Sequence, residues 1–437
     1  MPIFTCVEVN SSGLGILKDG NLTYTYKDCL VGETFLYEHA KNKIKILKRL
    51  TDSKDRVKPF CKYYDTCGGC QIQHMSYANQ LKFKKETVIN DLKMFHVKTT
   101  VNDTIEDKDQ THYRNKLITT YKPINRKQFI AGMYEENTHK VVKVVDCPIQ
   151  NKLGNKVIKY INGLLIKHKV EAFDEDKRTG VLRHILIRVG VHTNEVLVCL
   201  ISGNKIFPGI NNLLKDIKKE PSIKSVYLNI NERKSSAVLS NNFKHLYGSK
   251  YIKDELLGLT FMIGPDTFYQ INPDQTKILY KHAIETLELS KEDDLLDCYS
   301  GIGTITLSAS KHAKSVTGVE YNHASTEMAI ENAKVNKITN AKFYTDDATT
   351  FILRAVSEKK YYSKIIVDPP RMGLDKAFIE AVIKMKPKRF TYVSCNPATL
   401  SRDLSLFEKD YIIESVTPLD MFPQTYHVEC VASLRLK

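Results

Sequence analysis

Cys395 has the clearest chemical potential in this chain, because it stands on a polar turn directly after an apolar, β-branched run. Asp368, followed by two prolines and Arg371, precedes it, and Glu429 follows it near the C-terminus. A thiolate can add to an electrophilic ring, and a carboxylate can then remove a proton from the adduct. This order of one thiol and two carboxylates predicts covalent catalysis on an electrophilic ring.

Uracil is such a ring. Attack of the Cys395 thiolate on uracil C6 would make C5 electron-rich enough to take a methyl group, and Glu429 would then remove the C5 proton so that the thiol can leave. In isolation, a strand-end Cys is more often a small buried hydrophobe, and a Glu is more often a surface carboxylate. The motifs around both residues favour the catalytic interpretation.

A glycine-containing loop at residues 297–304 follows one apolar run and leads into a helix-like segment. Its glycines let backbone N–H groups approach a ligand, although Thr306 stands where a dinucleotide fingerprint has its third glycine. Glu320 ends the next apolar run, where it could bind both ribose hydroxyls, and Asp347 follows the third, where it could meet an adenine amino group. The acidic turn suits the ammonium and sulfonium of S-adenosylmethionine better than a pyrophosphate. The alternative is a plain turn with a surface Glu.

Four cysteines form a second constellation, with Cys61, Cys67 and Cys70 close together and Cys147 far downstream. Three clustered thiols and one distant thiol suit a [4Fe–4S] cluster, and Pro148 after Cys147 is typical of such sites. Structural zinc usually has two C-x-x-C pairs, and one is present here. The spacing favours iron–sulfur over zinc, and a site without metal is the third alternative.

The elements that must position these residues fall into three parts. Residues 1–56 contain short strand-like runs separated by glycines, which predicts an OB-like barrel, although another small β barrel would fit almost as well. Residues 57–260 contain the cysteine loop, an amphipathic helix at 77–95 and then mostly strands, which indicates an α+β domain. In residues 261–437 helices alternate with apolar strands, as in a doubly wound parallel sheet. The predicted fold class is multidomain α/β with a Rossmann-like C-terminal domain.

The formal net charge of +15 suits a polyanionic partner, and nucleic acid is the commonest. The alternative is that a lysine-rich surface serves solubility. No apolar run approaches the ~20 residues of a membrane span, and the N-terminus lacks the pattern of an export signal. We therefore expect a cytoplasmic protein that binds RNA and no membrane, and nothing in the sequence indicates an obligate protein partner.

Five motifs give the chain a resemblance to the RNA 5-methyluridine methyltransferases, and they occur in that family's order. They lie at residues 269–272, 297–304, 368–371, 394–400 and 420–429. The family uses S-adenosylmethionine to methylate uracil C5 in ribosomal or transfer RNA. The resemblance implies that Cys395 is the nucleophile and Glu429 the base. The cofactor contacts that it implies come from Gln270, Tyr299, Glu320 and Asp368, with Asp347 beside them.

The resemblance covers nearly the whole chain. Many ribosomal-RNA members carry this cysteine pattern with a [4Fe–4S] cluster, and residues 1–56 resemble the TRAM domain that precedes those members. The long-known bacterial transfer-RNA enzymes lack both features, so the resemblance favours 23S ribosomal RNA as the substrate. Ser300 stands where many members have Cys, a departure that leaves the loop intact.

Three alternatives stay open. RNA cytosine-5 methyltransferases share the cofactor fold and use a Cys, but their fourth-strand motif has a Pro-Cys pair where this chain reads Asp-Pro-Pro-Arg from Asp368. Methylation of uridine in transfer RNA is the second alternative. A non-catalytic iron–sulfur protein that binds RNA is the third, and it would leave Cys395 and Glu429 idle.

Overall fold

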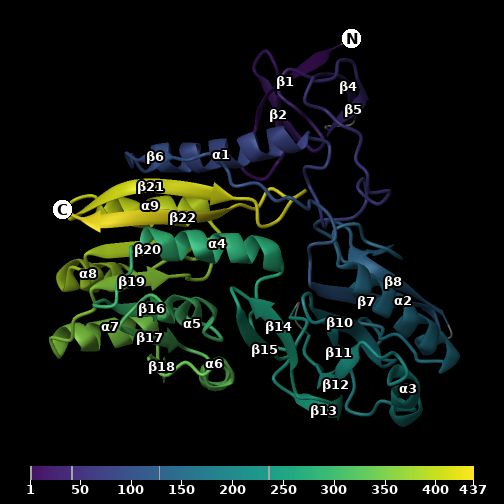
Figure 1. Cartoon of the computed structure of the whole chain (residues 1–437). Coiled ribbons are helices and arrows are strands. Elements are labelled where there is room, and N and C mark those ends of the chain that lie inside the picture. The colour runs from purple at the N-terminus through teal and green to yellow at the C-terminus, as the bar shows by residue number, and fades with distance from the viewer. Residues whose placement is uncertain (1, 41–42, 127, 235–236) are drawn as a thin grey trace.

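The computed structural model describes residues 2–40, 43–126, 128–234 and 237–437. Figure 1 shows three parts: an N-terminal β module next to helix α1, a middle domain, and a C-terminal sheet flanked by helices. The described part of the chain contains no helix with the length and apolar character needed to cross a membrane.

The N-terminal module is an antiparallel sheet in the order β3-β2-β1-β4-β5. Its strands are β1 (Ile3–Val9), β2 (Gly15–Asp19), β3 (Leu22–Tyr26), β4 (Thr34–Ala40) and β5 (Lys43–Arg49). Phe4, Leu17 and Phe35 are buried in its small core. The sheet agrees with the predicted OB-like module.

The middle domain is built on a seven-stranded sheet in the order β13-β12-β11-β10-β7-β8-β9. Its strands are β7 (Lys116–Asn125), β8 (Gln128–Tyr134), β9 (Val141–Lys143), β10 (Leu182–Gly190), β11 (Glu195–Ser202), β12 (Ile223–Ile230) and β13 (Phe243–Gly248). Helices α2 (Lys152–Lys167) and α3 (Ile210–Ile217) bury apolar side chains against this sheet. The hairpin of β14 (Ile252–Leu256) and β15 (Leu259–Ile263) leads onward, and the predicted boundary after residue 260 falls within β15.

The C-terminal domain contains an eight-stranded sheet in the order β18-β17-β16-β19-β20-β22-β21-β6. Its strands are β16 (Asp294–Cys298), β17 (Ser315–Glu320), β18 (Ala341–Thr345), β19 (Lys364–Val367), β20 (Arg389–Ser394), β21 (Tyr411–Leu419), β22 (Glu429–Leu436) and β6 (Thr100–Val101). The strands from β18 to β20 are parallel, but β22 is antiparallel to β20 and β21. The sheet is therefore mixed and not wholly parallel as predicted, because residues 420–428 turn the chain back and β22 runs antiparallel between β20 and β21.

Helices cover both faces of this sheet. The core of one face contains α1 (Tyr77–Met94), α7 (Ala348–Ser357), α8 (Lys376–Met385) and α9 (Pro397–Phe407), and the core of the other contains α4 (Pro273–Thr286), α5 (Thr304–Ser310) and α6 (His323–Val335). Although α1 and β6 come early in the chain, they lie beside β21 (Figure 1). The carboxyl ends of the parallel strands form one edge, where the sites of such folds lie.

Candidate functional site

Cys395 and Glu429 lie at this edge, at the ends of two neighbouring strands. Ser394, the last residue of β20, pairs with Cys430 in β22, so the next step of the antiparallel ladder brings Cys395 and Glu429 together. Cys395 is half-buried, and Glu429 is only 2% exposed. The two residues predicted to act as nucleophile and base are therefore neighbours, although they are 34 positions apart in the sequence.

Both groups hold their protons more tightly than usual. Burial, with the negative charges of Glu429 and Asp368, raises the pKa of Cys395 to about 11, and the Arg371 guanidinium opposes this shift. Burial also raises the pKa of Glu429 well above its ordinary value, and Asp368 adds to the effect. Oε2 of Glu429 has no hydrogen-bond partner among the described residues. Ionisation of Cys395 or Glu429 therefore needs a bound ligand or a nearby cation that stabilises the charged form.

The loop after β19 is tied to the turn after β20. The carbonyl oxygen of Arg371 accepts hydrogen bonds from Asn396 Nδ2 at 3.0 Å and from Thr399 Oγ1 at 3.2 Å. Nη2 of Arg371 lies 3.5 Å from Nδ1 of His427. Burial raises the pKa of Asp368, in the same loop, to about 7. One loop thus places a carboxyl and a guanidinium beside the thiol.

The loop after β16 supplies buried acceptors that the protein itself does not use. Oδ2 of Asp297 accepts a hydrogen bond from Thr306 Oγ1 at 2.5 Å, whereas Asp297 Oδ1 and the Ser300 hydroxyl have no partner within the described chain. Burial, opposed by the bond from Thr306 and reinforced by Asp368, raises the pKa of Asp297 to about 7. Buried carboxylate oxygens without partners favour a cationic ligand.

Tyr299 and Glu320 lie at the carboxyl ends of β16 and β17. Tyr299 has a left-handed φ of 68°, and its ring lies 6.3 Å from that of Phe378. The two carboxylate oxygens of Glu320 accept backbone N–H bonds, from Gly301 at 3.0 Å and from Asn322 at 2.8 Å. These bonds fix Glu320 beside the glycine loop, as ribose binding requires. The cofactor contacts of both residues stay predictions.

Asp347 lies further along the same edge, after β18. Its carboxylate is exposed, and Oδ1 accepts hydrogen bonds from the Thr350 N–H at 2.9 Å and from the Thr350 hydroxyl at 3.1 Å. Asp347 is therefore the N-cap of α7. Adenine binding by this residue stays a prediction, and the capping role was missed because the sequence reasoning did not identify α7.

Gln270 lies in the segment before α4. It is almost fully buried, and its carbonyl oxygen accepts a hydrogen bond from Asn115 Nδ2 of the middle domain at 3.1 Å. Burial raises the pKa of Tyr280 in α4, whose hydroxyl lies close to the Gln270 side chain and to Asp368. Sequence reasoning missed Tyr280. The signal that could have placed it on a helix is Asn272 before a proline, a common helix start.

The four cysteines that were predicted to bind a cluster line one cavity. It is lined by Cys61, Cys67, Cys70 and Cys147, and all four are free, half-buried thiols. Among the described residues, however, no group of three or more Cys, His, Asp or Glu side chains is arranged to hold a metal ion. The soft thiol donors fit an iron–sulfur cluster in chemistry, whereas a finished ligand cage is not found in the described part of the chain.

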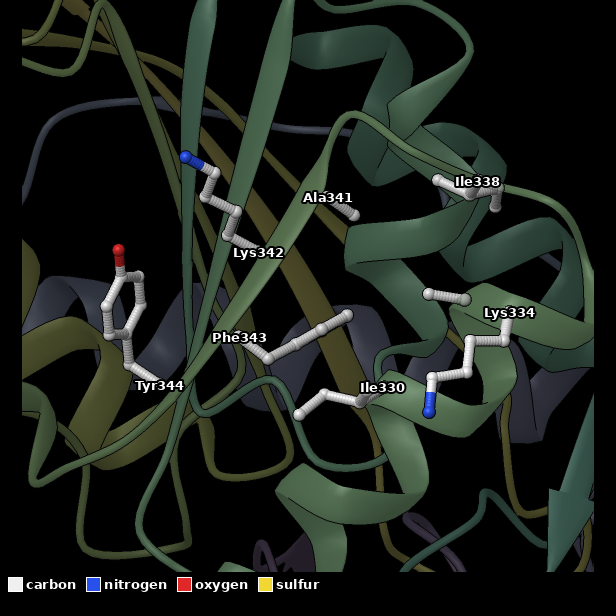
Figure 2. Close-up of a pocket in the computed structure, with 8 residues that line it drawn as sticks. Ile330, Lys334, Ile338, Ala341, Lys342, Phe343 and Tyr344 are labelled. Atoms are coloured by element: carbon white, nitrogen blue, oxygen red, sulfur yellow. The ribbon is translucent and has the colours of Figure 1, made fainter.

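A hollow of about 390 Å³ lies elsewhere, between α6 and β18 at the outer edge of the sheet. Figure 2 shows Phe343 pointing toward Ile330, with Lys342 and Tyr344 on the other side of the strand. None of the residues predicted to be catalytic or cofactor-binding lines this hollow. The site is therefore assigned by its chemistry and not by the size of a hollow.

Comparison with known proteins points to one family. The model of the family described as tRNA (uracil-5-)-methyltransferase matches residues 76–437. A protein named as an uncharacterized RNA methyltransferase of Staphylococcus aureus strain N315 is 37% identical over 441 residues, which cover 99% of this chain and 97% of the relative. A protein of the same description from Oceanobacillus iheyensis is 39% identical over 400 residues, which cover 90% and 86%.

One solved structure matches nearly the whole fold. It is the Pyrococcus abyssi tRNA (uracil-54, C5)-methyltransferase in complex with S-adenosyl-L-homocysteine. Its TM-score is 0.79 at 26% sequence identity, and the match covers 98% of this chain and 99% of that one.

Proposed function

This chain belongs to the tRNA (uracil-5-)-methyltransferase family and is an RNA methyltransferase, and we propose that it methylates uracil C5 in RNA with S-adenosylmethionine as the donor. The proposal is carried by the meeting of Cys395 and Glu429 at the ends of β20 and β22. The Pyrococcus abyssi enzyme was crystallised with S-adenosyl-L-homocysteine, the product that such a donor leaves, which supports this choice.

Each step is assigned to a group at this edge of the sheet. The Cys395 thiolate adds to uracil C6, and the ring becomes an enolate across C4 and C5. C5 then takes the methyl group from the donor sulfonium, and S-adenosylhomocysteine is released. Glu429 removes the proton from C5, the C5–C6 double bond forms again, and the Cys395 sulfur leaves. Arg371, beside the thiol, favours its ionised form.

The donor is assigned to the edge between the β16 loop and the β19 loop. Its ammonium and sulfonium would offset the charge of the buried carboxylates there, and the oxygens without protein partners support such a ligand. Glu320 keeps lone pairs for ribose hydroxyls beyond its two backbone bonds. The residues that we propose to hold the donor are Gln270, Tyr299, Glu320, Asp347 and Asp368.

Two substitutions test the chemistry. Cys395→Ala should abolish methyl transfer to RNA while donor binding stays largely intact, because the sulfur attacks the base and not the donor. Glu429→Gln should make a covalent RNA adduct accumulate on denaturing gels, since the C5 proton stays in place. Labelled donor with bulk RNA provides the assay. Full turnover in Cys395→Ala would remove the covalent mechanism, and full turnover without an adduct in Glu429→Gln would remove Glu429 as the base.

For the RNA, we propose 23S ribosomal RNA, on the resemblance of the N-terminal module and the cysteine pattern to ribosomal-RNA members. Transfer RNA is the second candidate, because the family is described by transfer RNA and the Pyrococcus abyssi transfer-RNA enzyme matches 98% of this chain. A match of that extent includes the N-terminal module, so the module alone does not separate the two substrates. Incubation of the protein with each RNA, followed by mapping of 5-methyluridine, shows which of the two RNAs is the substrate. Methylation of transfer RNA alone would overturn the ribosomal assignment.

We also propose that Cys61, Cys67, Cys70 and Cys147 hold a [4Fe–4S] cluster, which would tie the cysteine loop to the middle domain. The support is their position around one cavity and the softness of four thiolate donors. Protein purified without oxygen should absorb broadly near ~400 nm and contain about four iron atoms. A colourless protein with one zinc ion would overturn the assignment.

A further inference from the structure

The segment between β21 and β22, residues 420–428, carries Glu429 at its end, and it is neither helix nor strand. Within it, the Thr425 hydroxyl donates to the carbonyl of Phe422 at 2.9 Å, and Gln424 has a left-handed φ of 75°, an uncommon conformation for a side chain of this size. Yet Gln424 is 5% exposed, so its polar groups need partners inside the protein. Those partners come from elements far away in the sequence.

The side chain of Gln80 on α1 holds Gln424 by two reciprocal hydrogen bonds. Nε2 of Gln80 donates to Oε1 of Gln424 at 3.0 Å, and the backbone N–H of Gln424 donates to Oε1 of Gln80 at 3.1 Å. Gln80 is 1% exposed, and its Nε2 also donates to the carbonyl of Met75 at 3.1 Å. A reciprocal pair in a water-free environment specifies one arrangement.

The carbonyl of Gln424 is held by the cysteine loop. It accepts hydrogen bonds from the backbone N–H groups of Gln71 and Ile72, at 3.1 Å and 3.2 Å, and these residues directly follow Cys70. A further contact reaches the neighbouring residue, since the Tyr113 hydroxyl donates to the carbonyl of Pro423 at 2.9 Å. The segment before Glu429 is therefore held by α1, the cysteine loop and Tyr113, in addition to the ladder that pairs Glu429 itself with Leu419.

We propose that Gln80 and Gln424 are positioning residues for Glu429, an inference that rests on the proposed function. They act through the backbone: their clamp fixes the segment five residues before Glu429, and so fixes where the carboxylate meets the uracil C5 proton. Cys395 stands on the turn between β20 and α9, which the clamp does not touch. Loss of the clamp should therefore slow proton removal more than thiolate addition.

Gln80→Leu, which keeps the size of the side chain and removes its polar atoms, tests this prediction. We expect kcat to fall on the order of 100-fold, the loss that a misplacement of about 1 Å can cause. The KM values for RNA and donor should change little, and a methylated covalent RNA adduct should accumulate on denaturing gels. A merely misfolded enzyme would lose the adduct together with the activity. Asn79→Ala, one position earlier on the same helix, is the matched control and should behave as wild type.

A second variant covers the case in which Gln80→Leu does not fold. Gln424→Asn tolerates the left-handed φ but shortens the side chain, so it should lose the bond to Gln80 and give the same adduct. The inference would be overturned if a folded variant kept the kcat of the wild type and formed no adduct. In that case the wild-type protein would still form 5-methyluridine, so the proposed function would stand. A wild-type chain that leaves uracil unmethylated would instead overturn the proposed function, and this inference with it.

Discussion

At the scale of single residues, Arg371 opposes the effects that keep the Cys395 thiol protonated. Burial and two carboxylates raise the pKa of the thiol to about 11, and the charge and hydrogen bond of Arg371 act against them. Because Cys395 and Glu429 must both lose protons before turnover, and the pKa of each is raised, the single-turnover rate at saturating RNA should rise with pH above neutrality. In Arg371→Ala this rise should move to higher pH, with about a tenfold loss for each unit added to the thiol's pKa.

The control for this prediction is Arg354→Ala, which removes an arginine of α7 from a surface ion pair with Asp346. Its profile should coincide with that of the wild type. A profile of Arg371→Ala that is lowered equally at all pH values, with a raised KM for RNA, would assign Arg371 to RNA binding instead.

The buried carboxyl group of Asp297 lowers the stability of the folded protein when it is ionised. Burial raises its pKa to about 7, so the folded state favours the neutral acid. A carboxyl group whose pKa is raised by folding stabilises the folded state fully at pH values below its pKa in the unfolded chain. For Asp297 this contribution to the free energy of unfolding is lost as the pH rises from about 4 to about 7. Asp297→Asn should therefore be more stable than wild type at pH 8, by up to about 4 kcal/mol, with a smaller gain at pH 5. Denaturant unfolding at both pH values measures this, and equal stability at pH 8 would contradict it.

The residues of the site differ in how far sequence could predict them. Cys395, Asp368 and Glu320 could be placed at one edge, because parallel strands bring their carboxyl ends together. The pairing of Gln80 with Gln424 could not, because it joins residues 344 positions apart. That contact depends on α1 crossing to the C-terminal sheet, and no local pattern encodes such a crossing.

At the scale of elements, local periodicity predicted most of the helices but not α4 or α7, and it did not predict which strands pair with one another. The helix expected at 77–95 is α1 (Tyr77–Met94), and the strands expected in the middle domain are present. Sequence reasoning missed β22, because the chain runs from β21 to β22 without the intervening helix that a doubly wound sheet predicts. It also missed β6, whose two residues form a strand only by pairing with β21.

A buried ion pair between Lys84 and Asp420 joins α1 to the end of β21, beside the apolar contacts of Val88 and Leu92. Both side chains are fully buried, and Lys84 Nζ also donates to the carbonyl of Phe422 at 3.2 Å. Lys84→Met would leave the Asp420 carboxylate buried without its cation, so we expect a loss of about 3–5 kcal/mol in the free energy of unfolding. The double variant Lys84→Met/Asp420→Leu should recover most of this loss, since neither charge then remains buried. Denaturant unfolding checks both variants, and an unchanged Lys84→Met would contradict the prediction.

At the scale of the whole molecule, the positive charge is concentrated in one part. Residues 57–260 contain 34 Lys and Arg against 20 Asp and Glu, whereas residues 261–437 contain 22 against 23. The part that carries Cys395 and Glu429 is thus close to neutral. Since phosphate contacts supply most of the affinity for nucleic acid, we expect the middle domain, with its cysteine loop and α1, to bind the RNA.

Lys116, at the start of β7, carries part of this charge beside the segment that contains Gln270. Its neighbour Asn115 binds the carbonyls of Gln270 and Ile271, which places Lys116 next to the cofactor segment. Burial, with the positive charges of Arg188 and Arg114, lowers the pKa of Lys116 to about 8, and its Nζ has no hydrogen bond or ion pair with the described residues. An RNA phosphate would relieve this repulsion.

Lys116→Ala should therefore raise the KM for RNA several-fold at unchanged kcat, and should reduce the slope of log affinity against log salt by about 0.7–0.9. Lys376→Ala, which removes an exposed lysine of α8, should change neither quantity. An unchanged salt slope in Lys116→Ala would mean that this cation stabilises the domain and does not bind the substrate.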